Sequence, residues 1–449
     1  MQSARPVQTF SPSEPEAQAT AARPASNSAA NWALGLLLAI NLFNYIDRQV
    51  LAAVEPQIRE TLLAGDPNAK AKTGLLATAF LFSYMLMAPV FGILADRYSR
   101  WILCGISVAL WSLASGWSGL AMSFGVLLFT RMLVGVGEAG YGPSAPTIIS
   151  DLFPLEKRGR MLSYFYLAIP VGSALGYGIG GFIASHWGWR WAFYAVVPPG
   201  LLLAALCLFM RDKRKPRAKP VALEGATKAD RFAHYKSLLK IRSYVCNTAA
   251  MTAMTFAIGG IAFWIPSYVY EYRGSEFPQS PQLLGAINMT FGAICVVAGL
   301  IATLLGGWTG DRLRKRYPGS YFLVSGVGMA LAFPFTVAML YVPFPYAWGC
   351  IFFAVFFLFF NTGPANAALA NVTPPDIRAT AFAMNILVIH ALGDAISPPL
   401  IGYVAGKSSM NAAFLMVSGM MLVASFFWLW GSRYLGADTA AIENATKAG

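Results

Sequence analysis

Long apolar runs recur through this chain of 449 residues. A hydrocarbon core about 30 Å thick is crossed by a helix of roughly 20 residues, and about twelve runs reach that length. The predicted spans are 32–54, 73–95, 101–121, 124–148, 161–184, 189–210, 244–270, 283–308, 320–342, 346–371, 379–404 and 412–431. Because the runs are continuous and do not alternate with polar residues, they predict helices and not barrel strands. The expected fold class is an all-α integral membrane protein with twelve transmembrane helices.

The composition also requires a membrane. Hydrophobic residues make up 57% of the chain and charged residues 12%, which leaves too little polar surface for a soluble protein of this length. If the N-terminus is inside, about 25 Lys and Arg residues fall on the inner side and about 6 outside, and positive loops stay cytoplasmic. Both termini are therefore expected in the cytoplasm. The net charge of +13 then reflects topology, and nucleic-acid binding is excluded because no folded basic domain carries the charge.

Two loop motifs occur twice, once in each half of the chain. GILADRYSR at 92–100 is matched by GWTGDRLRKR at 307–316, and FPLEKR at 153–158 is matched by TPPDIR at 373–378. The offsets are about 215 and 220 residues, as expected for internal repeats with loops of different length. This duplication predicts two pseudo-symmetric six-helix bundles around a midplane cavity, the arrangement that alternating access requires.

The polar stretches predict where the domains begin and end. The longest of them, 211–243, is rich in Lys and Arg and falls between the sixth and seventh spans. We expect it to be a basic cytoplasmic linker between bundles at 31–210 and 244–433. Residues 1–30, rich in Ala, Ser and Pro, are expected to form a disordered cytoplasmic tail, and 434–449 a second cytoplasmic tail.

These motifs resemble a known family. The loop at 92–100 and its repeat are similar to the signature of the major facilitator superfamily. Four further segments resemble its Spinster branch: NYIDR (44–48), RMLVGVGEA (131–139), PTIISDLF (146–153) and YLAIPVGSALGY (166–177). The resemblance implies the major facilitator fold and transport of a lysophospholipid or a sphingosine phosphate. We expect a secondary transporter that is proton-coupled, as a symporter or an antiporter, with a facilitative carrier as the alternative. Related organic-anion symporters share parts of these patterns, so a small organic anion or a drug stays an alternative substrate.

Charged residues inside the spans are the main functional candidates, because each costs several kcal/mol in the bilayer. Asp47 and Arg48 are consecutive and point about 100° apart, so neither neutralises the other. Arg131 and Glu138 are seven residues apart, roughly 10 Å along one helix face. We expect an Asp47–Arg131 or an Arg48–Glu138 contact, with a carboxylate that takes up a proton when the contact breaks. A permanent ion-pair network that only packs the helices is the alternative.

Other polar residues could contact a substrate. His390 and Asp394 are one helical turn apart and share a face, so they predict either a proton-exchanging pair or a structural one. Intramembrane asparagines can line a cavity or bond a neighbouring helix. The expected substrate-binding residues are Arg48, Arg131, Glu138, Asn366, Asn385, His390 and Asp394. A guanidinium suits an anionic headgroup because it binds phosphate or carboxylate through two hydrogen bonds.

The loop motifs are expected to act mechanically. In the superfamily such charges latch the cytoplasmic side of the outward-facing state, and the resemblance gives that role to Asp96, Arg97, Arg100, Arg158, Asp311, Arg312 and Arg378. Ordinary positive-inside anchoring would place similar residues there. In the fifth span, Gly172, Gly176 and Gly180 are spaced so that another helix backbone can approach closely.

Several other functions are excluded or less favoured. The G-x-G-x-x-G match at 135–140 lies inside an apolar span without a preceding strand, so it does not predict a dinucleotide site. There is no G-x-x-x-x-G-K-[ST], no cofactor motif and no catalytic cluster, and the five cysteines have no metal-ligand spacing. We expect a monomeric transporter, not an enzyme, whose partners are protons, the bilayer and its substrate. A non-transporting receptor is the alternative from another class. The positions of the Asn-x-Ser/Thr matches, in spans or on the inner side, favour a bacterial inner membrane.

Overall fold

The computed structural model describes residues 27–153, 155–212, 238–374 and 378–448. The regular structure in these residues is helical, and twelve segments are long and apolar enough to cross a membrane. The first half contains α1 (Asn27–Leu62), α2 (Ala69–Arg97), α3 (Arg100–Gly119), α4 (Phe124–Tyr141), α5 (Ser144–Leu152), α6 (Leu155–Trp187), α7 (Trp189–Ala195) and α8 (Val197–Leu208). The second half contains α10 (Arg242–Tyr272), α11 (Leu283–Arg314), α12 (Ser320–Ala338), α13 (Tyr346–Phe359), α14 (Thr362–Asn371), α15 (Arg378–Ile389), α16 (Ser397–Lys407) and α17 (Met410–Ala448). The predicted all-α membrane fold is confirmed.

Several spans differ in detail from their predicted ranges. The first was expected to end at residue 54, but α1 continues to Leu62. The last was expected to end at residue 431, but α17 continues through most of the expected tail. The eleventh consists of α15 and α16 joined by a π-helical turn, His390–Asp394. Most of the expected linker lies within 213–237, outside the described residues.

Each half forms its own bundle. In the first half α1 packs along α6, and α2 and α3 pack against α4; in the second half α17 packs between α10 and α12. The contact between α1 and α6 depends on small residues in α6. A Cβ atom on Gly176 would lie 2.5 Å from the carbonyl oxygen of Ile46, and one on Gly172 would lie 2.5 Å from that of Leu42. The predicted close approach of a helix backbone to this glycine face is therefore confirmed.

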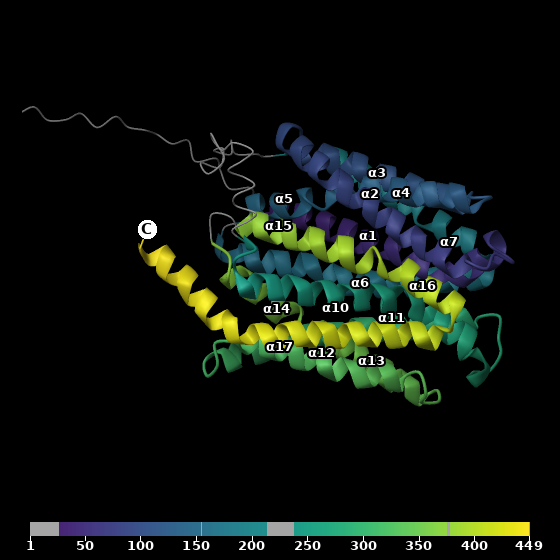
Figure 1. Cartoon of the computed structure of the whole chain (residues 1–449). Coiled ribbons are helices and arrows are strands. Elements are labelled where there is room, and N and C mark those ends of the chain that lie inside the picture. The colour runs from purple at the N-terminus through teal and green to yellow at the C-terminus, as the bar shows by residue number, and fades with distance from the viewer. Residues whose placement is uncertain (1–26, 154, 213–237, 375–377, 449) are drawn as a thin grey trace, which may run out of the picture.

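The two halves meet along α6 with α11 and along α2 with α16. The number of spans is even, so α1 begins and α17 ends at the same end of the bundle. We call this end the proximal end. The opposite end, on the right in Figure 1, is the distal end. Between described residues, the hydrogen bonds that join the halves lie in the distal part, as with Asn288 Nδ2 to the Ala53 carbonyl at 3.0 Å and Ser267 Oγ to Glu55 at 2.7 Å. The bundle is therefore held closed at its distal end.

The five cysteines are unpaired and buried or half-buried within the helices. In the part of the chain that the structure describes, no group of His, Cys, Asp and Glu side chains could hold a metal ion.

Candidate functional site

An ion pair lies at the centre of the first bundle. Arg48 on α1 donates from Nε to Glu138 Oε2 on α4 at 2.7 Å. The Glu138 side chain is fully buried, whereas the Arg48 side chain is 23% exposed. Of the two contacts expected between the first and fourth spans, this one is formed. Part of the Arg48 side chain is therefore not covered by protein.

Aromatic rings surround the Arg48 guanidinium. Its central carbon lies 5.1 Å from the ring centroid of Tyr45, 4.8 Å from that of Phe80 and 5.5 Å from that of Tyr84. A cation within about 6 Å of an aromatic face is attracted to it, and more strongly where water is excluded. These three rings therefore attract the guanidinium in addition to its carboxylate partner.

Asp47 has a different partner from the one expected. Its two carboxylate oxygens lie 2.6 and 2.7 Å from the hydroxyl of Ser115 on α3, which donates its single proton. The residue is fully buried. The expected direct Asp47–Arg131 ion pair is absent between these two described residues, although their charges interact at longer range. The partner of Asp47 thus lies in the third span. The repeated serines of that span are the feature of the sequence that could have indicated it.

Arg131 is a buried cation with unused hydrogen-bonding capacity. It is 1% exposed, and its Nε and Nη1 atoms have no hydrogen-bond partner. Its guanidinium carbon lies 5.6 Å from the centroid of Phe80, the ring that also faces Arg48. Burying an unsatisfied charged donor is costly, so this side chain is positioned to gain from a nearby acceptor. The second oxygen of Glu138, Oε1, is also buried without a partner.

The second bundle contributes a titratable pair. His390 Nδ1 lies 3.0 Å from both carboxylate oxygens of Asp394, and the two side chains are 32% and 21% exposed. The π-helical turn that carries them packs against α10 and α2, and single π-turns within helices are frequent at functional sites. Asp394 is also close enough to interact electrostatically with Tyr45 of the first bundle. The predicted pair is formed, and it lies toward the Arg48 side of the interface between the halves.

The two asparagines expected to bind substrate form hydrogen bonds to other residues of the helices. Asn385 is 1% exposed and accepts a hydrogen bond from Thr248 of α10 at 2.8 Å, which joins two helices. Asn366 is exposed and donates to the carbonyl of Thr362 in its own helix at 2.8 Å. Their part in substrate binding stays a prediction.

An apolar cavity of about 280 Å³ opens between α1 and α6. Its lining residues are Leu38, Ala39, Leu42, Leu167, Ala168 and Val171. Leu42 lies one helical turn before Tyr45, so the two side chains are neighbours on α1. The apolar surface thus begins beside the aromatic rings that surround Arg48.

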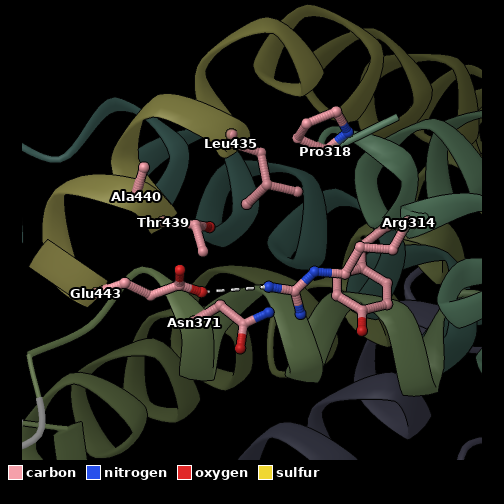
Figure 2. Close-up of a pocket in the computed structure, with 9 residues that line it drawn as sticks. Arg314, Pro318, Asn371, Leu435, Thr439, Ala440 and Glu443 are labelled. Atoms are coloured by element: carbon pink, nitrogen blue, oxygen red, sulfur yellow. Dashed lines mark ion pairs between the residues drawn. The ribbon is translucent and has the colours of Figure 1, made fainter. Parts of the chain in front are cut away.

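A second cavity, of about 200 Å³, lies at the proximal end of the second bundle (Figure 2). Its lining residues are Arg314, Pro318, Tyr321, Asn371, Leu435, Gly436, Thr439, Ala440 and Glu443. Within it Arg314 Nη2 faces Glu443 Oε1 at 3.7 Å. None of its helices carries the charged residues described above, so it is separate from the central site.

Comparison with known proteins gives the family. Residues 37–393 match the profile described as Major Facilitator Superfamily. Protein spinster homolog 1 of Xenopus tropicalis is 38% identical over 92% of this chain and 81% of its own length, and the human homolog is 36% identical over 90% and 79%. The chain belongs to the spinster branch of the major facilitator superfamily. It is a multi-pass membrane transporter and not an enzyme.

Solved structures show the same fold. A bacterial homolog of the human lysosomal transporter Spinster, in an inward-facing and unoccupied conformation, superimposes on this spinster-family chain with a TM-score of 0.72 and 20% identity, over 94% of this chain and 99% of that one. A D-xylose–proton symporter matches with a TM-score of 0.68 and 19% identity, over 88% and 96%.

The expected latch residues lie at the proximal end of this spinster-family transporter. Arg100 is buried and binds within its own half, with Nη1 2.7 Å from Asp151 and Nη2 2.8 Å from Asp212. Asp311 likewise accepts from Tyr321 of its own half at 2.7 Å. Arg97 and Arg312 are exposed. The side chains of Asp96, Arg158 and Arg378 lie outside the described part of the structure. A latch between the halves therefore stays a prediction, and it concerns the outward-facing conformation.

Four charged residues at the distal end were missed, because they fall just outside the predicted spans. They are Glu55, Arg59, Lys70 and Glu271. α1 continues to Leu62, and Glu55 is fully buried within it, bonded to Thr73 and Ser267. The continuation of the apolar pattern through Ile58 and Leu62, at helical spacing, was the signal that could have extended the first span.

Proposed function

We propose that this transporter is a proton-linked carrier of an amphiphilic anion, a lysophospholipid or a sphingoid phosphate, that works by alternating access. We place it in a bacterial inner membrane as a monomer with both termini in the cytoplasm. The observation that carries the proposal is the Arg48–Glu138 ion pair, in which a partly exposed arginine is paired with a fully buried carboxylate.

The headgroup in this proposal binds Arg48. A phosphate accepts two parallel hydrogen bonds from a guanidinium, and the rings of Tyr45, Phe80 and Tyr84 keep the cation oriented toward it. The unpartnered Nε and Nη1 atoms of Arg131 supply further donors nearby. The anionic substrate thus competes with Glu138 for the same cation.

Proton uptake by a carboxylate follows from the competition between substrate and Glu138 for Arg48. When substrate takes over Arg48, Glu138 is left as a buried carboxylate without its cation, which is costly in a low-dielectric site. Protonation of Glu138 removes the cost. Protonation of the buried neighbour Asp47 lowers it, because Arg131, which interacts with both carboxylates, then compensates Glu138 alone. Return of Arg48 to Glu138 then releases the proton and favours release of the substrate. Proton and substrate movement are coupled because both act on one guanidinium.

The acyl or sphingoid chain is assigned to the apolar cavity between α1 and α6. Leu38, Leu42, Leu167 and Val171 line it, and Leu42 lies one helical turn before Tyr45, one of the rings around Arg48. An amphiphile can therefore lie with its phosphate on the guanidinium and its chain along α1. A small hydrophilic anion would leave this surface unused.

The test is flux of a labelled lysophospholipid or sphingoid phosphate in proteoliposomes, with and without an imposed pH gradient. We expect gradient-stimulated flux in the wild type and its loss in Asp47→Asn. The matched control is Glu60→Gln, which neutralises an exposed carboxylate on the same helix and should transport normally. Stimulation by the gradient that is unchanged in Asp47→Asn would refute its role in coupling.

A carrier of a small organic anion is the second candidate. The half-exposed His390–Asp394 pair gives the second bundle a polar surface that a compact hydrophilic substrate could bind. Flux of a small dicarboxylate by a wild type that moves no lysolipid would favour this candidate over the first.

A further inference from the structure

A buried carboxylate at the distal end has no part in the site described above. Glu55 lies on α1, seven residues beyond Arg48 and roughly 10 Å further along the helix axis. Its Oε1 atom accepts from Thr73 Oγ1 at 2.8 Å and from Arg59 Nε at 3.1 Å, both in the first half. Its Oε2 atom accepts from Ser267 Oγ at 2.7 Å, and Ser267 belongs to α10 of the second half.

Two further ion pairs next to Glu55 also cross between the halves. Arg59 pairs with Glu271 of α10 through Nη2, and Lys70 Nζ lies 3.5 Å from the other oxygen of Glu271. Lys70 also contacts the hydroxyl of Tyr272. We call these residues the Glu55 cluster: Glu55, Arg59, Lys70, Thr73, Ser267 and Glu271.

Helix backbones pack tightly beside this cluster. A Cβ atom on Gly74 of α2 would lie 2.5 Å from the carbonyl group of Pro398 at the start of α16. A Cβ atom on Gly402 of α16 would overlap the carbonyl oxygen of Lys70. The two halves therefore touch backbone to backbone at the same level as the charges, and the cluster is shielded from water on that side.

Opening the distal end must divide the cluster. Glu55, Arg59, Lys70 and Thr73 stay with the first half, which then carries one excess positive charge, while Ser267 and Glu271 leave with the second half. The bond of Glu55 to Thr73 survives this separation and its bond to Ser267 does not. Opening exchanges the Glu55–Ser267 bond and the Glu271 ion pairs for hydration, and a hydrogen bond to a charged group is worth about 1.5–3 kcal/mol net, so the cluster opposes opening.

We propose that Glu55 is the positioning residue that closes the distal end of this transporter, through its cross-half bond to Ser267 and supported by the pairing of Arg59 and Lys70 with Glu271. Thr73 and Arg59 hold the carboxylate in the orientation that receives Ser267. The inference rests on the alternating access proposed above, but it concerns the balance between two conformations and not the substrate or the proton.

The test compares two hydroxyls that bind the same carboxylate. Spin labels on Ala64→Cys and Ser280→Cys, exposed sites in opposite halves at the distal end, report the separation of the halves by pulsed electron resonance in nanodiscs. The background replaces the five native cysteines. We expect Ser267→Ala to raise the ratio of open to closed distal ends about tenfold, the equivalent of one hydrogen bond to a charged group. Thr73→Val is the matched control, and it should change the ratio far less because its bond persists in both states.

A second pair of variants guards against a change in folding. Glu271→Gln removes the cross-half ion pairs and should also populate the longer distance, whereas Glu60→Gln, exposed on α1, should not. Distance distributions identical to wild type in both Ser267→Ala and Glu271→Gln would overturn the inference. So would an equal shift in Ser267→Ala and Thr73→Val. Because the measurement needs no substrate, its failure leaves the flux result with Asp47→Asn untouched.

Discussion

The contact between α1 and α6 can be tested with two glycines of one helix. A Cβ atom on Gly176 would lie 2.5 Å from the carbonyl oxygen of Ile46 and 2.8 Å from the Cβ atom of Gln49, whereas one on Gly178 would meet nothing within 4 Å. Backbone cannot give way as a flexible side chain can, so Gly176→Ala must push the two helices apart. Ile46 directly precedes Asp47, and the displacement therefore reaches the central site.

The expected magnitude follows from comparing the two variants. Each gains about 0.9 kcal/mol of helix propensity when glycine becomes alanine, so that gain cancels in the comparison. Overpacking costs about 1–3 kcal/mol, and we expect Gly176→Ala to be less stable than Gly178→Ala by that amount. Gly178→Ala itself should be as stable as the wild type or slightly more so.

The assay is thermal unfolding in detergent followed by tryptophan fluorescence, together with flux in proteoliposomes. Gly176→Ala should unfold at a lower temperature and transport more slowly, and Gly178→Ala should do neither. Equal unfolding temperatures for the two variants would refute the backbone contact. A loss of stability without any change in flux would show that α1 absorbs the displacement before it reaches Asp47.

Two further variants test contacts at the ends of the bundle. Arg100→Gln removes a buried guanidinium that pairs with Asp212 and should cost about 3 kcal/mol of stability, measured by thermal unfolding, whereas Arg97→Gln at an exposed site should change it by less than about 0.5 kcal/mol. In the loop after α10, Arg273 binds Glu276 and lowers the pKa of that carboxyl below its usual value. A lowered pKa means that this pairing stabilises the protein at neutral pH and is lost as the pH falls through the lowered value. Arg273→Gln should therefore lower the unfolding temperature at pH 7 more than at pH 3, and an equal loss at both would contradict the pairing.

The apolar runs predicted the spans because a bilayer imposes one length and one polarity on every crossing helix. The ends of the spans were harder to predict. At residue 55 a glutamate follows the apolar run, and the sequence does not show that Thr73 and Ser267, far away in the chain, would satisfy it. Helices therefore continued beyond the points where hydropathy indicated a surface.

The candidate site was predictable where the partners share a helix. His390 and Asp394 are four residues apart, so helical geometry alone brings them together. Partners on different helices depend on how the helices pack and rotate. Sequence spacing left open whether Arg131 or Glu138 would meet the first span, and the structure forms only the Glu138 contact directly. The serines of the third span indicated that it could supply a partner for Asp47, but sequence spacing did not single out Ser115 among them.

Phe80 has a position with a mechanical consequence. Both guanidinium carbons lie within 5.6 Å of its ring centroid, 4.8 Å for Arg48 and 5.6 Å for Arg131. Two residues earlier on α2, Thr78 bonds the carbonyl of Ala395 in the other half. Thr78, Phe80 and both arginines belong to the first half, so separation of the halves breaks the Thr78 bond but carries the ring and the two cations together. The two arginines therefore keep this shared aromatic neighbour on both sides of the conformational change.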